Sequence, residues 1–228
     1  MKLKPLRQST TPDDVYVVLR KAILDGGLTA GSQLREMHIA ADLGISRAPV
    51  REAFRRLEEE GLVVKIPFRG AFVAELTPQT IAEILALRSV VEPYAAEQAL
   101  ETLRGPRRQQ LERAVEALKK ASHQKNVAAT IDGHLRFHRL FYEYSGNGML
   151  LDLWNSWESR LRLYLVAEHH LYENLVDLEG PHEELATIVL EGNVRQVRKA
   201  IVDHLHSARL AYLDDGSRSD LSGPTAGS

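Results

Sequence analysis

The 228-residue sequence contains no cysteine, which excludes disulfides, thiolate metal sites and cysteine nucleophiles. It has no apolar run near the about 18 residues that span a bilayer. The first fourteen residues are basic but lack the hydrophobic segment of a secretory signal. We therefore expect a cytoplasmic protein that does not associate with a membrane.

An excess of charge of one sign is also lacking, because the chain carries 29 basic and 31 acidic side chains. This balance argues against a chain that binds nucleic acid along its whole length. It is an average, however, over two unlike segments. Residues 1–78 carry 12 basic and 10 acidic side chains, whereas residues 79–228 carry 17 and 21, with eight of the nine histidines. We predict a domain boundary at this point.

The first segment, residues 1–78, shows the pattern of three short helices and a hairpin. Apolar residues recur at helical spacing from Val15 to Ile23, with Asp13 or Asp14 as the expected cap. Further helices are predicted over 36–42 and from Ser46 to Gly61, and strands over 62–66 and 71–74 around a turn at 67–70. This order is that of a winged helix-turn-helix, a DNA-binding fold.

The second segment, residues 79–213, shows only helical patterns and predicts an all-α helical bundle. Helices are expected over about 78–103, 111–121, 127–145, 148–173, 180–191 and 194–213. The end of the chain, 214–228, is rich in Gly, Ser and Asp, and we expect it to be a disordered tail. The predicted fold is mostly α: an N-terminal winged helix-turn-helix with a small β-hairpin, then the bundle.

The third predicted helix carries Arg47, Arg51 and Arg55 at intervals of four residues, so they share one face. The planar guanidinium donates two parallel hydrogen bonds to guanine edges or phosphates. Ser46 and the free amides at the start of this helix could hold a phosphate. The wing adds Lys65, Arg69 and Gly70. The alternative is a solvated surface helix, as Glu58-Glu59-Glu60 at its far end would fit.

These residues belong to a longer pattern that resembles the DNA-binding domain of the GntR family of bacterial transcription regulators. The matching segments are Leu19–Gly26, Leu34-Arg35-Glu36, Leu43–Ala53, Arg55-Arg56-Leu57, Gly61-Leu62-Val63 and Arg69–Val73. The resemblance implies a homodimer on a short palindromic operator in double-stranded DNA. We predict DNA contacts by Arg35, Ser46, Arg47, Arg51, Arg55, Lys65, Arg69 and Gly70.

Two positions depart from this family pattern. Met37 stands where an arginine that helps to read DNA is usual, and His38 follows where an acid is usual. We expect these differences to alter the operator sequence or the affinity.

The histidines of the second segment suggest a metal site. His134 and His138 are four residues apart on one predicted helix. His182 and His204 lie ten and eleven residues from a Gly-Asn turn, so a helical hairpin places both roughly 15–17 Å from it. Four converging imidazoles suit zinc, nickel, copper or iron. The alternative is scattered histidines on helix surfaces.

Residues 79–213 also resemble the FCD effector domain of FadR-type regulators, through Leu87-Arg88 with Glu92, Phe137-His138, Gly146-Asn147, His182 to Asn193, and His204-Leu205. Many such domains hold a divalent metal with one Asp and three His, which correspond here to His138, His182 and His204. The aspartate position holds His134, and Asp132 would face elsewhere. Because His134 replaces an anionic oxygen ligand by a neutral nitrogen, the site should favour a transition metal, zinc or nickel, over Mg²⁺ or Ca²⁺.

The resemblance further implies a small carboxylate effector bound at the metal. Arg88 is the candidate for a second contact to that effector, and a surface ion pair with Glu92 is the alternative role. Our leading hypothesis is a ligand-responsive transcription repressor, not an enzyme. A metal-free sensor of an acyl-CoA-type ligand is a second hypothesis. A metal-dependent hydrolase is a third, in which Glu183 or Asp203 would have to act as the base.

Overall fold

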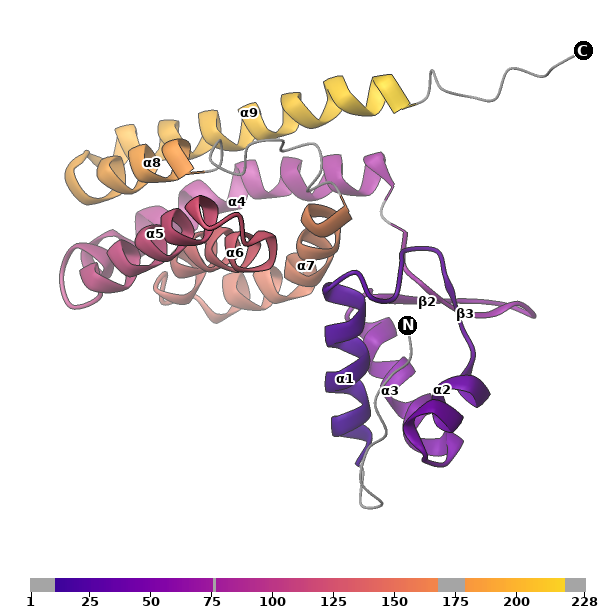
Figure 1. The fold of residues 1–228 in the computed structure, drawn as a ribbon. Helices are drawn as coiled ribbons and strands as arrows, with labels where there is room; N and C mark the ends of the chain where they lie inside the picture. The colour runs from indigo at the N-terminus through magenta and orange to yellow at the C-terminus, as the bar shows by residue number, and fades with distance from the viewer. Residues whose placement is uncertain (1–10, 76, 168–178, 220–228) are drawn as a thin grey trace, which may run out of the picture. The chain divides into compact units, whose positions relative to one another are not determined.

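A computed structural model describes residues 11–75, 77–167 and 179–219. The chain forms two compact units, labelled by element in Figure 1. The winged-helix unit comprises residues up to 76 together with 155–173, and the helical unit comprises 77–154 together with 174–228. The expected fold class is confirmed, because the structure is mostly helical with a small antiparallel sheet near the N-terminus.

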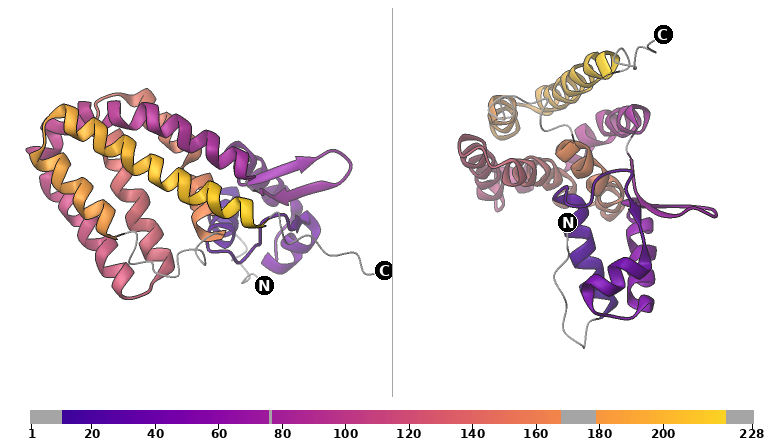
Figure 2. Two further views of the ribbon diagram at one scale, coloured as in Figure 1. Left: turned by 90° about the horizontal axis from the view of Figure 1, so that it is seen from above. Right: turned by 45° about the vertical axis from the view of Figure 1, so that its right-hand side comes forward.

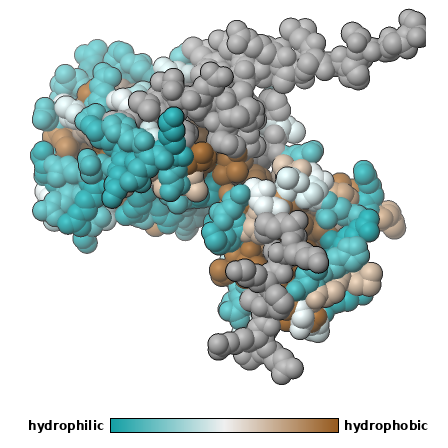
Figure 3. Space-filling model, viewed as in Figure 1, coloured by the Kyte–Doolittle hydropathy of each residue, from teal (hydrophilic) through white to brown (hydrophobic). Residues whose placement is uncertain are grey.

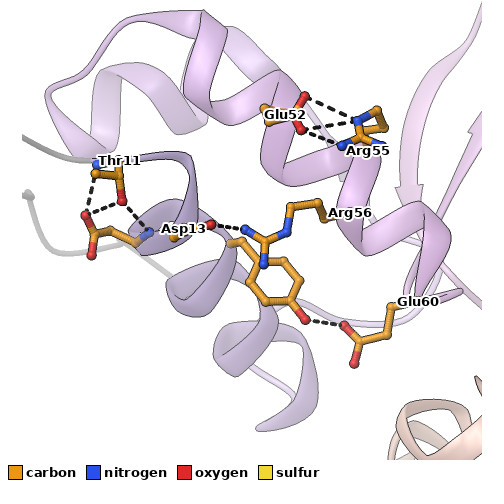
Figure 4. Close-up of polar contacts among 8 residues, drawn as sticks. Thr11, Asp13, Glu52, Arg55, Arg56 and Glu60 are labelled. Atoms are coloured by element: carbon orange, nitrogen blue, oxygen red, sulfur yellow. Dashed lines mark hydrogen bonds and ion pairs between the residues drawn. The ribbon is translucent and has the colours of Figure 1, made fainter. Parts of the chain in front are cut away.

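The winged-helix unit begins with three helices: α1 (Pro12–Leu24), α2 (Glu36–Leu43) and α3 (Arg47–Glu59). Thr11 caps α1, since its side chain accepts from the Asp14 amide while the Asp14 carboxylate accepts from the Thr11 amide. Figure 4 shows Thr11 at this end of the helix. The expected cap at Asp13 or Asp14 was therefore placed two to three residues late, because Asp14 contributes to the cap from inside the helix.

The sheet has three strands, β1 (Gln33–Leu34), β2 (Val63–Ile66) and β3 (Gly70–Val73), in the order β1-β3-β2. The hairpin of β2 and β3 was expected from the sequence, but β1 was not. It pairs Gln33 with Phe72 and Leu34 with Ala71. A strand of two residues has no alternation that could identify it, so its pairing is decided by tertiary contact. The third strand joins the wing to the segment that leads into α2.

The core of the winged-helix unit lies between α1, α3 and the sheet. Leu19, Ile23, Leu57 and Leu62 are fully buried in it. Leu163, from the helix α7 (Gly148–Ala167), belongs to the same core and is 5% exposed. The sequence predicts this helix over 148–173, of which 168–173 lies outside the described residues.

Polar contacts also tie α7 to this unit. Arg20 of α1 donates to Ser159 at 3.0 Å, and Ser159 donates to Glu60 at the end of α3. Arg20 also pairs with Glu60 at 2.7 Å. The winged-helix unit is therefore completed by a segment that follows far along the chain.

The helical unit contains α4 (Pro78–Arg104), α5 (Arg108–His123), α6 (Val127–Glu143), α8 (Glu179–Glu191) and α9 (Val194–Ser219), with the first part of α7. The pairs α4 with α9 and α5 with α6 pack side by side, as Figure 2 shows. Thr77 caps α4, because its side chain accepts from the Thr80 amide. The helix α9 continues to Ser219, past the start of the expected irregular tail at 214, because each further residue adds a hydrogen bond to an existing helix.

Close helix packing in this unit depends on Gly133 of α6. A Cβ atom at Gly133 would lie 2.9 Å from the Leu118 Cα of α5, so only a glycine fits there without movement of backbone. The face of the helical unit seen in Figure 3 is mostly hydrophilic. Within the described ranges, no helix is both long and apolar enough to cross a membrane.

Candidate functional site

The side chains of Arg47, Arg51 and Arg55 are all exposed along α3. Arg47 and Arg51 share Glu36 of α2 as a partner, at 3.1 and 3.5 Å. Arg55 pairs with Glu52 at 2.6 Å and with Glu59. Ion pairs this exposed are weak, so phosphates can replace the carboxylates at little cost. The predicted face is therefore present and accessible.

Arg56, the neighbour of Arg55, has a structural role. It pairs with Asp13 of α1, and its guanidinium lies 4.0 Å from the centre of the Tyr16 ring. Figure 4 shows Arg56 directed toward Asp13, while Arg55 bonds to Glu52 on α3 itself. Arg56 thus binds α3 to α1 rather than adding to the arginine face.

The wing presents Lys65, Arg69 and Gly70, all exposed. Lys65 pairs with Glu58 at 2.7 Å. The Gln33 amide donates to the Arg69 carbonyl at 2.8 Å, and Arg35 donates to the Gln33 side-chain oxygen at 2.9 Å. These two bonds connect the wing to the start of α2. Gly70 has φ +99°, a conformation that side chains rarely adopt.

A hollow of about 650 Å³ lies between the wing, α2 and α3. Its lining includes four of the residues predicted to contact DNA, namely Arg35, Arg47, Lys65 and Gly70. Met37 and Phe68 also line it, and both are exposed. Ser46 is the N-cap residue of α3 but its side chain makes no capping hydrogen bond. The eight predicted residues therefore all lie exposed at α2, α3 and the wing.

The second candidate site lies inside the helical unit, where the structure brings the four predicted imidazoles together. His134 and His138 come from α6, His182 from α8 and His204 from α9. Ring nitrogens of the first three all lie within 4.8 Å of one another. The His204 ring is 4.6 Å from that of His182 and 5.3 Å from that of His138, but it is not part of the close set. Asp132 is exposed and lies outside the cluster.

The spacing of the nitrogens fits a metal ion. His138 Nε2 and His182 Nε2 are 3.2 Å apart. Two tetrahedral zinc–nitrogen bonds of the usual length place their nitrogens roughly 3.3 Å apart. The Nδ1 atom of His134 is buried and has no hydrogen-bond partner. Such an atom is costly to bury unless something binds it, and a cation would do so. The residues present therefore fit a divalent transition metal.

The protonation of these histidines also suits metal ligands. Burial, followed by the neighbouring positive groups, lowers the pKa of His134 and His138 well below the usual 6.5. Burial lowers the pKa of His204 to about 3. The imidazoles of His134, His138 and His204 are therefore neutral near pH 7, and neutral imidazole is the form that binds metal.

Glu92 of α4 completes the site, and it was considered from the sequence only as a partner for Arg88. Its side chain is fully buried. The Nδ1–H of His138 donates to Glu92 Oε1 at 2.5 Å. Arg88 Nε and the Tyr142 hydroxyl donate to Oε2 at 2.9 and 3.2 Å. The bond to Nδ1 leaves the lone pair of His138 on Nε2, which faces His182.

Arg88 is buried as well, so its pair with Glu92 is not the surface ion pair considered from the sequence. The reason is that both side chains face the interior of the bundle from consecutive turns of α4. Arg88 Nη2 lies 2.8 Å from Glu92 Oε2, but without the alignment of a hydrogen bond. One donor of the guanidinium thus stays unsatisfied inside the protein.

Comparison with known proteins agrees with both halves of this structure. The family of bacterial regulatory proteins called gntR matches residues 11–73, and the FCD domain family matches residues 83–207. The protein belongs to the GntR family. This GntR-family chain carries its arginine face and wing inside the first match, and its four histidines inside the second.

Individual relatives of this GntR-family protein are distant. The B. subtilis regulator YdhC is 31% identical over 60% of this chain and 62% of its own length, so the match spans less than two thirds of that relative. A probable D-xylose utilization operon transcriptional repressor of Paenarthrobacter nicotinovorans is 31% identical over 67% of each chain. The structure of E. coli McbR/YncC has a TM-score of 0.74 at 21% identity, covering 91% of this chain and 99% of that one, and shows the likeness of the fold.

Proposed function

We propose that the protein is a DNA-binding transcription repressor that acts as a homodimer on a palindromic operator. The observation that carries this proposal is the exposed arginine face of α3, held beside a wing in a GntR-family domain. The relative from P. nicotinovorans is named as a repressor, which supports the sign of regulation. A dimer doubles the phosphate contacts and so compensates for the small positive charge of residues 1–78.

The test is binding of the purified protein to the region upstream of its own gene, compared with shuffled DNA of the same composition. We expect a preference for the native region that weakens as salt rises, because bound phosphates release counterions. Arg51→Ala should weaken binding and lower the slope against salt by about two, because each protomer of the dimer loses one phosphate contact. Arg113→Ala, an exposed arginine on α5, is the matched control and should change neither. Equal binding to native and shuffled DNA would contradict the proposal.

We further propose that the helical unit is the effector domain and binds a divalent transition metal, zinc or nickel. His134, His138 and His182 would hold the ion, with His204 beside them. The ion supplies a positive centre to which a small carboxylate can bind. The unsatisfied donor of Arg88 supports a second contact to the same carboxylate. We propose residues 1–78 as the DNA-binding domain and 79–213 as the effector domain, with the part of α7 from Asn155 onward packed in the winged-helix unit. Of the expected tail at 214–228, residues 214–219 continue α9 and the rest lies outside the described residues.

Metal analysis of the purified protein tests this proposal. We expect about one zinc or nickel ion per chain, lost in His182→Ala and retained in His206→Ala, an exposed histidine of α9. A protein that takes up no metal after exposure to Zn²⁺ would favour the acyl-CoA-type sensor instead.

The hydrolase hypothesis finds little support. Glu183 and Asp203 are exposed and pair with Lys119 and Lys199 rather than facing the histidines.

A further inference from the structure

The tip of the wing holds an aromatic residue in an unusual backbone conformation. The Arg69 amide donates to the Ile66 carbonyl at 3.0 Å, which closes a turn with Pro67 and Phe68 at its centre. Phe68 has φ +62°. The third position of such a turn favours glycine or asparagine, and a bulky residue with positive φ is a rare outlier. The backbone of the wing therefore gives no reason for a phenylalanine.

Packing within the chain gives no reason for it either. Phe68 is 110% exposed, more than any other large hydrophobic residue among those described. It takes no part in the core of the winged-helix unit. A strained backbone that carries a fully solvated aromatic ring is unfavourable in the free protein, which favours a contact of this ring with a surface outside the chain.

The backbone of the turn is held in place, and two cationic residues stand on the same hairpin. The turn is braced by the Gln33 bond to the Arg69 carbonyl, and β2 and β3 pair up to Ile66 and Gly70 directly below it. Arg69 adjoins Phe68, and Lys65 lies on the same hairpin. The tip is thus an apolar ring flanked by positive charge. The partner that combines a polyanionic surface with apolar slots is duplex DNA, between its base steps.

We propose that Phe68 is a wedge that inserts between two base pairs in the minor groove and bends the operator. Lys65 and Arg69 would hold the phosphates on either side of the opened step. Apolar side chains used in this way partly unstack the bases and bend the duplex, which lets the DNA contact more protein. Sequence preference would then arise at this step from its flexibility, without hydrogen bonds to its bases. The proposal rests on the DNA-binding function proposed above.

The test uses the full-length protein and a short duplex that the wild type selects from random-sequence DNA. Energy transfer between dyes at the two duplex ends reports the bend. Phe68→Asn removes the ring but suits a positive φ, so the urea unfolding midpoint should be equal to or above that of the wild type. We expect F68N to lose the bend and about tenfold or more in affinity. The slope of binding against salt should not change, because no charge is removed.

Arg69→Gln is the matched control on the same turn. It should lower the salt slope by about two, one for each protomer, while the bend persists. Phe68→Trp should keep the bend. The fluorescence of the added indole should be quenched when it stacks on bases, whereas the fluorescence of the buried Trp154 and Trp157 should not change.

Four results would overturn the wedge. The first is a wild type that binds the duplex without bending it. The second and third are an F68N that bends DNA as the wild type does and an F68N whose salt slope falls together with its affinity. The fourth is a change of oligomeric state in F68N, since the ring would then contact a second copy of the chain. A wild type that binds no DNA at low salt would instead overturn the proposed function itself.

Discussion

Glu92 Oε1 and His138 Nδ1 lie 2.5 Å apart with both side chains fully buried, although 46 residues separate them. A carboxylate behind a ligating histidine fixes which ring nitrogen carries the proton and raises the basicity of the other. The candidate metal centre is therefore oriented from α4 as well as from the helices that carry its imidazoles.

We predict that Glu92→Gln weakens zinc binding about 10- to 100-fold, because the amide holds His138 less firmly in the required tautomer. It should also lower the free energy of unfolding by about 3–5 kcal/mol, since Arg88 would remain buried without its counter-charge. Competition with a chromophoric chelator measures the first effect and urea unfolding the second. Glu97→Gln, whose partner Arg198 is exposed, is the control. Unchanged zinc affinity in a folded E92Q would exclude this role for Glu92.

His134 offers a second prediction, because its Nδ1 is buried without a hydrogen-bond partner. His134→Ala should reduce the stabilisation by zinc, which is about 2.7 kcal/mol for a normal site at a hundredfold excess over Kd. His134→Asp should shift the preference toward Mn²⁺ and Mg²⁺, since it supplies an anionic oxygen. Thermal unfolding with and without each ion measures both effects. If zinc stabilised H134A as much as the wild type, His134 would not be a ligand.

The packing of α5 on α6 gives a prediction that does not depend on any ligand. Gly133→Ala places a Cβ atom 2.9 Å from the Leu118 Cα and 3.1 Å from its Cβ. Because backbone must move to relieve this contact, we expect a loss of about 1–3 kcal/mol in unfolding free energy. Gly148→Ala meets no atom within 4 Å and serves as the control. Equal urea midpoints for the two variants would show that α5 and α6 can move apart to accommodate the Cβ atom without a cost in stability.

Glu60 makes stability depend on acid pH. Burial alone would raise its pKa, but hydrogen bonds from Arg20, Ser159 and Tyr16 outweigh this and lower the pKa below 4.5. The folded state thus gains stability that is fully present above pH 4.5 and is lost as pH falls through the lowered pKa. Glu60→Gln should have a lower urea unfolding midpoint than the wild type at pH 7. The two midpoints should approach each other as the pH falls below the lowered pKa of Glu60. Glu59→Gln, exposed one residue earlier, should differ little at either pH. A difference that grew toward low pH would have the wrong sign.

The local elements could be predicted from the sequence because their causes are local. The arginine face, the start of α3 at Ser46 and the glycine-bounded helices all follow from spacing within one or two turns. One helical period predicts that His134 lies beside His138, and the similar arm lengths of a hairpin predict that His182 lies level with His204.

What could not be predicted depends on contacts between distant residues. The strand β1 exists only because β3 lies beside it. Glu92 and Arg88 share a helix, so their pairing could be predicted from the sequence. The bond of Glu92 to His138 could be predicted only from the packing of α4 on α6. The tie from Arg20 and Glu60 to Ser159 likewise spans more than ninety residues. No spacing within the sequence indicates these contacts.

The discontinuity of the winged-helix unit has a consequence for how the protein is made. Residues 77–154 are synthesised between its two parts. On the ribosome, the arginine-bearing segment emerges first, but its core remains open until Leu163 is available to fill it. By then α6 and two of the four histidines have already been translated. A chain that stalls before α7 would thus lack Leu163 and the hydrogen bonds of Ser159, and would expose the apolar surface of the winged-helix unit that Leu163 covers.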